Sequence, residues 1–248
     1  FFNIAYQTGI SKPFRWMLKK NNNLVILTFH RISDYRDQKW PTMPIASFRL
    51  LMEQLVKTFR IIDINSVNAI PDDSGPPFMV VTFDDGYRDF IDNAVPILLD
   101  LDVPACHNVS PLLIDRRTPP WTQVLSVCLD SLHDKYLQLP DGTDFPISKP
   151  IDEKVFLKLC DRLYLVNNEE RIEWLDNLVA TLQVTFDLYS MMTWDDIRSC
   201  IQSGFSIGSH SYSHRNLSQI DDAELLKTEI SQQKNNYFIS LNSNDETS

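Results

Sequence analysis

The stretch FMVVTFDDG, at residues 78–86, constrains the fold more than any other part of the sequence. Its first six residues are almost all apolar, which is typical of a short strand covered on both faces. Two adjacent carboxylates, Asp84 and Asp85, follow this run directly, and Gly86 comes next. The stretch therefore indicates a buried strand of a parallel sheet that delivers acidic groups to one end of that sheet.

Strand-like and helix-like stretches alternate around this strand. Strands are expected at LVILTFH (24–30), RIIDI (60–64), VPACHNV (103–109) and FSIGSH (205–210), and helices at 47–59, 92–101 and 193–204. Gly204 closes the last of these helices at its C-terminal end. This order predicts an α/β fold in which crossover helices connect parallel strands.

Residues 115–190 interrupt the alternation. Helical spacing of apolar residues occurs at 121–132, 153–165 and 169–182, so we expect a helical insertion within a single domain that spans residues 1–248. A helix is also expected within 1–23, and another at 221–238 with Asp221 and Glu224 at its start. The polar tail, 240–248, is expected to be loose.

The charge balance excludes some partners. The formal net charge is -10 and the basic residues form no long run, so nucleic acid is not an expected partner. No stretch approaches the roughly 20 apolar residues that span a bilayer. The sequence does not indicate an oligomeric state.

The four cysteines show no C-x-x-C spacing, so buried free thiols are expected in place of a zinc knuckle or a disulfide framework. Free thiols favour a reducing compartment. The chain begins with Phe1 and not with Met. The expected location is therefore the cytoplasm, or outside it if an upstream signal is missing from this sequence.

Three of the expected strands end in side chains that bind protons or metals: His30, the pair Asp84 and Asp85, and His210. The C-terminal ends of parallel strands open onto one face, so these groups should converge there. His214 follows His210 at a spacing that lets both rings reach one ion. Two imidazoles and one of the two carboxylates suit zinc or a similar divalent ion, with a coordination position left for water.

An open coordination position indicates catalysis, and the second carboxylate would then serve as a general base. Taken singly, each feature has another interpretation. An Asp-Asp-Gly sequence is most often a solvated turn, and an isolated histidine is most often a surface or core residue. The convergence of three strand ends is what favours a metal-dependent hydrolase.

The same residues resemble the polysaccharide deacetylases, the metal-dependent carbohydrate esterases with a NodB homology domain (carbohydrate esterase family 4). TFDDGY at 82–87 is similar to the first motif of that family, and GSHSYSH at 208–214 is similar to its second, H-S/T-x-x-H. The flanking sequences at 26–32, 95–105 and 192–220 also resemble those of the family. The resemblance implies a distorted (β/α) barrel and hydrolysis of acetyl groups from an N-acetylated glycan.

By position, the resemblance implies that Asp84 is the general base and that Asp85, His210 and His214 bind the metal. The general acid of the family is usually a histidine in a late motif, which this sequence lacks, so His30 is the substitute that we expect. The third motif, with Arg and Pro, is also absent after His214. The barrel is therefore expected to be incomplete toward its C-terminal end, or to have had a portion lost or replaced.

These departures leave three hypotheses. The chain is a metal-dependent polysaccharide N-deacetylase, a weak or inactive carbohydrate-binding accessory domain that retains the metal site, or a hydrolase of a small amide with the same three ligands. Asp84 favours an enzyme, because a binding module needs no base beside its metal. His107 is expected to pack in the core or beneath the site.

Overall fold

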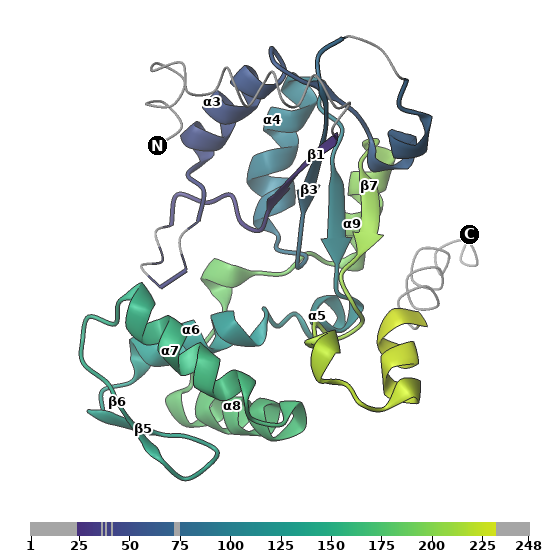
Figure 1. Ribbon diagram of the computed structural model, residues 1–248. Helices are drawn as coiled ribbons and strands as arrows, with labels where there is room; N and C mark the ends of the chain where they lie inside the picture. The colour runs from purple at the N-terminus through teal and green to yellow at the C-terminus, as the bar shows by residue number, and fades with distance from the viewer. Residues whose placement is uncertain (1–23, 36, 38, 41, 72–74, 232–248) are drawn as a thin grey trace, which may run out of the picture.

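The computed structural model describes residues 24–35, 37, 39–40, 42–71 and 75–231. The predicted helix within 1–23 and the tail at 240–248 lie outside the described residues. Five parallel strands form the main sheet: β1 (Leu24–Phe29), β2 (Arg60–Ile61), β3 (Phe78–Phe83), β4 (Cys106–Val109) and β7 (Ser206–Ser209). Their order is β1-β3-β4-β7, and β2 pairs with the first residues of β3 (Figure 1).

Crossover segments connect these strands: α3 (Ile45–Leu55), η1 (Ile64–Ala69), η2 (Phe90–Ala94), α4 (Val95–Asp100) and α9 (Trp194–Gln202). A single apolar core joins α3, η2, α4 and α9 to the sheet. The start of α9 is fixed by a capping box between Thr193 and Asp196. Shortly after α9, Gly204 adopts a positive φ of 90°, which a glycine tolerates without strain.

One face of β1 points into this core and the other is open. Val25, Leu27 and Phe29 contact the core, whereas Ile26 is 59% exposed. The α/β architecture with a parallel sheet is therefore confirmed. Within the described residues the sheet stays open, in agreement with a distorted and incomplete (β/α) barrel.

A second apolar cluster forms within the segment that follows β4. The elements of this segment are α5 (Pro111–Arg116), α6 (Trp121–Ser131), β5 (Tyr136–Gln138), β6 (Asp144–Pro146), α7 (Glu153–Tyr164), α8 (Asn168–Leu182) and η3 (Asp187–Tyr189). Ile114 of α5 and Tyr189 of η3 belong to the first core. The three helices expected here are present. The antiparallel hairpin of β5 and β6 was not predicted, because three-residue strands around a Pro-containing stretch give no clear alternation.

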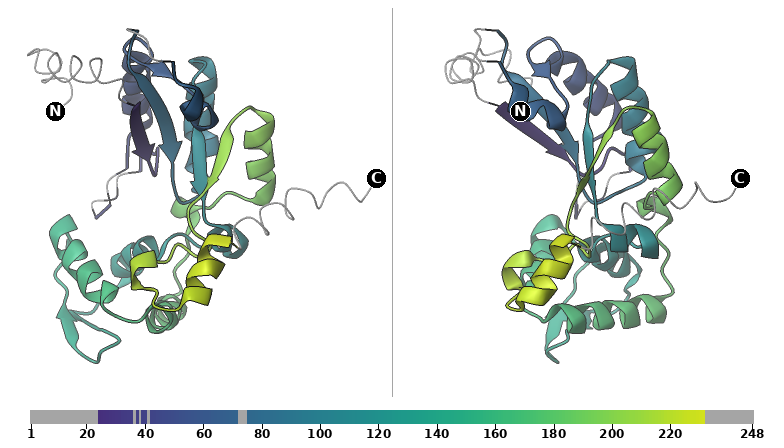
Figure 2. Two further views of the ribbon diagram at one scale, coloured as in Figure 1. Left: turned by 45° about the vertical axis from the view of Figure 1, so that its right-hand side comes forward. Right: turned by 90° about the vertical axis from the view of Figure 1, so that its right-hand side faces the viewer.

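This helical segment lies beyond the C-terminal ends of the strands, as both views in Figure 2 show. That residues 115–190 form an insertion within one domain spanning 1–248 stays a prediction. The predicted final helix is described over residues 223–231. Its cap is Asp222, whose Oδ1 accepts hydrogen bonds from the backbone of Glu224 and Leu225, and not Asp221 as the sequence suggested.

A buried carboxylate joins the two clusters. Asp37 Oδ2 accepts hydrogen bonds from Gln123 Nε2 (3.1 Å), Ser126 Oγ (2.9 Å) and Tyr189 Oη (2.9 Å). Its Oδ1 accepts the backbone N–H of Lys39 at 2.8 Å. Asp37 is 4% exposed, so these donors replace water almost completely. The loop after β1 is thereby attached to α6 and η3.

All four cysteines are buried free thiols, as expected. Among the described residues, no helix combines the length and the apolar character needed to cross a bilayer.

Candidate metal centre

The turn after β3 places two carboxylates at the mouth of the sheet. Asp85 and Gly86 both adopt positive φ, 79° and 98°. Aspartate tolerates this left-handed region better than most residues, and glycine enters it freely. A side chain at position 86 would also meet Ile114 Cδ1 at 2.8 Å, so the turn requires glycine there.

Backbone hydrogen bonds hold this turn on two sides. Asp84 N–H donates to Phe29 O at the end of β1 (3.0 Å), and Met192 N–H donates to Gly86 O (2.9 Å). Beyond the turn, Arg31 Nε donates to Asp89 Oδ2 at 2.8 Å. The carboxylates therefore project from a backbone that two separate segments, the end of β1 and the residues before α9, fix in place.

The loop 210–214, which we call the histidine loop, follows β7. His210 N–H donates to Val109 O (3.0 Å), and Ser110 Oγ donates to His210 O (2.7 Å), so β4 and its continuation position the start of the loop. Ser211 and His214 have positive φ values of 61° and 58°. The loop thus turns sharply enough to bring His214 back beside His210.

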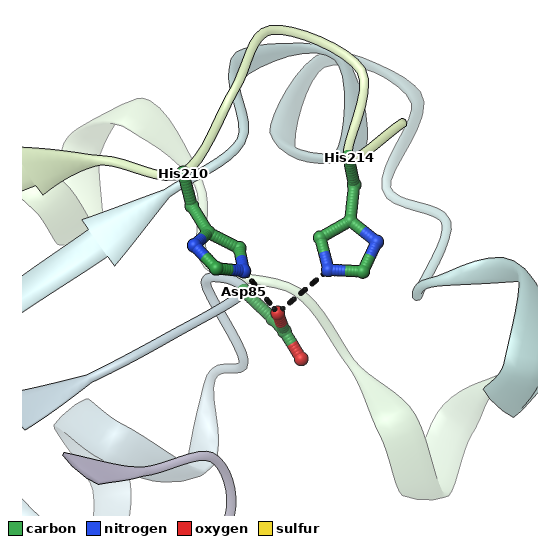
Figure 3. A group of neighbouring side chains, drawn as sticks. All are labelled: Asp85, His210 and His214. Atoms are coloured by element: carbon green, nitrogen blue, oxygen red, sulfur yellow. Dashed lines mark ion pairs between the residues drawn. The ribbon is translucent and has the colours of Figure 1, made fainter. Parts of the chain in front are cut away.

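The structure brings together the three residues that the resemblance implied as metal ligands. His210 Nε2 lies 3.4 Å from Asp85 Oδ1, and His214 Nε2 lies 3.1 Å from the same oxygen. One ligand atom from each residue falls within 4.8 Å of the others. Figure 3 shows both imidazoles pointing at the Asp85 carboxylate from the histidine loop.

This donor set fits a divalent cation. Asp85 Oδ1 is buried and accepts no hydrogen bond from the described residues, although two ring nitrogens face it. Burial lowers the pKa of His210, which favours a neutral ring with a free lone pair. Burial raises the pKa of Asp85, but the neighbouring histidines, His214 foremost, together outweigh this, so the carboxyl pKa lies below its usual value. An anionic oxygen beside imidazole nitrogens is the mixed set that zinc and similar ions prefer.

Asp84 lies next to this group but is held differently. Asn108 Nδ2 donates to Asp84 Oδ1 at 2.8 Å. Asn108 was not singled out from the sequence. The strand register explains its position: Thr82 pairs with Cys106, and two residues further along each strand the same row reaches Asp84 and Asn108.

His30 continues this row on the other side. Thr28 pairs with Thr82 across β1 and β3, so His30 and Asp84 occupy the following position on the same face. His30 is exposed. It is close enough to the candidate ligands to help lower the pKa of Asp85 by electrostatic attraction. Its role as an acid stays a prediction.

His107 belongs to the core beneath the site, as expected. Its ring is fully buried and packs edge-on against Phe90, with ring centroids 4.5 Å apart. Burial lowers the pKa of His107 to about 3, so the ring is neutral. Its Nε2 accepts the backbone N–H of Gly86 at 3.1 Å and thereby supports the turn that carries both aspartates.

A cavity of about 400 Å³ reaches the candidate metal centre from the helical segment. His214 and Ser213 line one end of it, and α8 contributes Asn168, Ile172 and Asp176. Its volume lies within the roughly 300–1,000 Å³ of ordinary ligand pockets. Of the three candidate ligands, His214 thus lines a space that a small molecule can enter.

Comparisons with known proteins agree with this picture. Residues 161–237 match the protein-family model described as polysaccharide deacetylase, a segment that includes the histidine loop. No curated protein matches the chain.

Solved structures with a similar fold include the Streptococcus pyogenes deacetylase PplD in complex with acetate. It is 15% identical with a TM-score of 0.53, and the alignment covers 88% of this chain and 69% of PplD. IcaB from Ammonifex degensii is 14% identical with a TM-score of 0.50 and the same coverage, 88% and 69%.

For the putative polysaccharide deacetylase BA0330 from Bacillus anthracis the identity is 16% and the TM-score 0.47. There the alignment covers 84% of this chain but only 46% of BA0330. Through the family match of residues 161–237 and the fold that it shares with PplD and IcaB, the chain resembles the polysaccharide deacetylases, as its two motifs predict.

Proposed function

We propose that this chain is a metal-dependent hydrolase that removes acetyl groups from N-acetylated sugars of a polysaccharide or its precursor. The proposal depends on one observation: His210 and His214 face a buried oxygen of Asp85 that accepts no hydrogen bond from the described residues, and Asp84 lies beside them. The family match and the shared fold support the same reaction.

Asp85 and the two histidines are the residues that would hold the ion, and zinc suits their nitrogen and oxygen donors. A bound divalent ion supplies Lewis acidity toward the acetyl carbonyl and makes water more acidic. The carboxylate is 7% exposed while the His210 and His214 side chains are 34% and 27% exposed, so the group is open to substrate on its imidazole side.

Asp84 is the base in this proposal. Asn108 occupies its Oδ1, which orients the carboxylate and leaves Oδ2 for the proton of the attacking water. Water then adds to the acetyl carbonyl carbon, the C–N bond breaks, and acetate and the free amine leave. The amine requires a proton, and His30, in the same row of the sheet as Asp84, is the candidate donor.

The decisive experiment measures acetate release from oligomers of chitin or peptidoglycan. Asp84→Asn should lower the rate by about 10²–10⁴-fold, the usual contribution of a general base. Asp92→Asn is the matched control, because Asp92 is an exposed acid nearby whose side chain forms a surface ion pair with Arg88. Removal of the metal with a chelator should abolish release, and added Zn²⁺ should restore it.

Equal release by the native chain and Asp84→Asn would refute this role of Asp84 and favour an accessory domain. Release from a small N-acetyl amide but not from any glycan would retain the chemistry and change the substrate class.

A further inference from the structure

Glu229 is a buried carboxylate outside the group of candidate ligands. It lies in the helical residues 223–231 and is 2% exposed. A carboxylate at this depth is costly unless hydrogen bonds replace its water. Its partners therefore indicate what it contributes.

Two of its partners, Tyr212 and Ser213, lie in the histidine loop. Glu229 Oε2 accepts the backbone N–H of Ser213 at 2.9 Å, and its Oε1 accepts Ser213 Oγ at 2.5 Å. The backbone carbonyl of Glu229 also accepts the N–H of Tyr212 at 3.0 Å. One residue thus fixes two consecutive positions of the loop, immediately before His214.

The loop needs such restraint. Ser211 and His214 lie in the left-handed region, which non-glycine residues occupy stably only where the surroundings determine the conformation. On the opposite side, Leu112 N–H donates to Tyr212 O at 3.0 Å. The loop is therefore held between the start of α5 and Glu229.

Arg215 extends the contact to α8. It follows His214 directly, its Nη2 donates to Glu169 Oε1 at 2.6 Å, and its Nε lies 3.6 Å from Glu229 Oε1. Glu169 is in the first turn of α8 and its side chain is mostly exposed, whereas Glu229 is buried. Of the two acids, Glu229 is the one whose loss would leave loop donors without partners inside the protein.

We propose that Glu229 is a positioning residue for the metal centre: through Ser213 it holds the histidine loop in the conformation that brings His214 to Asp85. This inference rests on the proposed metal site. It concerns a residue that touches neither substrate nor ion, and so it predicts an effect on metal affinity beyond any effect on stability.

The test compares Zn²⁺ affinity, measured by competition with a chelator, between the native full chain and four variants: Glu229→Gln, Ser213→Ala, the double variant that combines these two changes, and a control, Glu224→Gln. Glu229→Gln keeps the size of the side chain but removes one acceptor oxygen and the negative charge. Ser213→Ala removes one donor and leaves the backbone N–H. Glu224→Gln is the matched control, since it makes the same chemical change on the same helix at a side chain that is 84% exposed and forms a surface ion pair with Lys227.

Glu229→Gln should weaken Zn²⁺ binding by about 10–100-fold, as loss of a group that orients ligands usually does. Ser213→Ala should weaken it by less, and the double variant should lose less than the sum of the two, because both act through one contact. Glu224→Gln should bind as the native chain does. The visible spectrum of the Co²⁺-loaded protein should change in Glu229→Gln, because the geometry of the ligands changes.

Thermal unfolding of each metal-free variant shows whether it folds. If Glu229→Gln does not fold, the Zn²⁺ affinity of Ser213→Ala alone tests the proposal. Zn²⁺ affinities within twofold of native in folded Glu229→Gln and Ser213→Ala would overturn this inference and leave the metal site intact. A native chain that binds neither Zn²⁺ nor Co²⁺ would overturn both.

Discussion

Gly208 offers a sharp test of how the sheet positions Asp84. A methyl group at this position in β7 would lie 2.0 Å from Asn108 Oδ1 and 3.2 Å from Asn108 Cγ. Gly208 and Asn108 are register partners in β7 and β4, so the strand pairing leaves little freedom to move apart. In Gly208→Ala the Asn108 side chain must rotate away, and its 2.8 Å hydrogen bond to Asp84 is then lost.

The cost follows from two contributions. Overpacking of an ordered region costs about 1–3 kcal/mol. A hydrogen bond to a charged group contributes about 1.5–3 kcal/mol. Because Asn108 can partly relieve the clash by moving, we expect a loss of about 2–4 kcal/mol in the free energy of unfolding. Acetate release should fall as well, since Asp84 loses the contact that orients it.

Urea unfolding and the deacetylation rate measure these two effects. Gly204→Ala is the control, because an added methyl group at Gly204 has nothing within 4 Å and therefore cannot clash. That control should lose only the cost of a positive φ, about 1–2 kcal/mol, and keep its activity. In an Asn108→Ala background, Gly208→Ala should cost much less than in the native chain. An equal cost in both backgrounds would refute the steric explanation.

Three further predictions concern buried groups away from the candidate ligands. Asp37→Ala should lower the free energy of unfolding by about 3–5 kcal/mol in urea, because three side-chain donors lose their shared acceptor; a loss below 1 kcal/mol would contradict this. Burial raises the pKa of Asp89 to about 6, so between pH 6 and the usual value of 3.8 the folded state holds a proton that the unfolded state releases. The contribution of Asp89 to stability should therefore rise as pH falls through this range, so in pH-dependent unfolding the native chain should gain stability relative to Asp89→Asn. Burial raises the pKa of all four cysteine thiols to about 11 or 12, so a thiol reagent at pH 8 should label them only after unfolding.

The sequence predicted the parallel sheet and the meeting of its strand ends because both follow from local patterns. Apolar runs that end in acid or histidine identify β1, β3 and β7, and parallel pairing brings their ends to one face. The placement of Asp85, His210 and His214 within reach of one ion follows from that topology together with the i, i+4 spacing of the histidines.

The contacts that hold these groups could not be predicted in the same way. Asn108 contacts Asp84 because of the register between β3 and β4, and register is a property of the assembled sheet. Glu229 contacts Ser213 because the helix at 223–231 returns to the histidine loop, which no periodicity in the sequence indicates. The hairpin of β5 and β6 was missed because its strands have three residues each.

The central claim is that Asp85, His210 and His214 bind one divalent ion. Anomalous diffraction at the zinc absorption edge, from crystals of the Zn²⁺-loaded full chain, tests it most directly. We expect one peak about 2.0–2.2 Å from a carboxylate oxygen of Asp85 and from a ring nitrogen of each histidine. A fully loaded crystal with no peak at these residues, or with its zinc bound elsewhere, would contradict it.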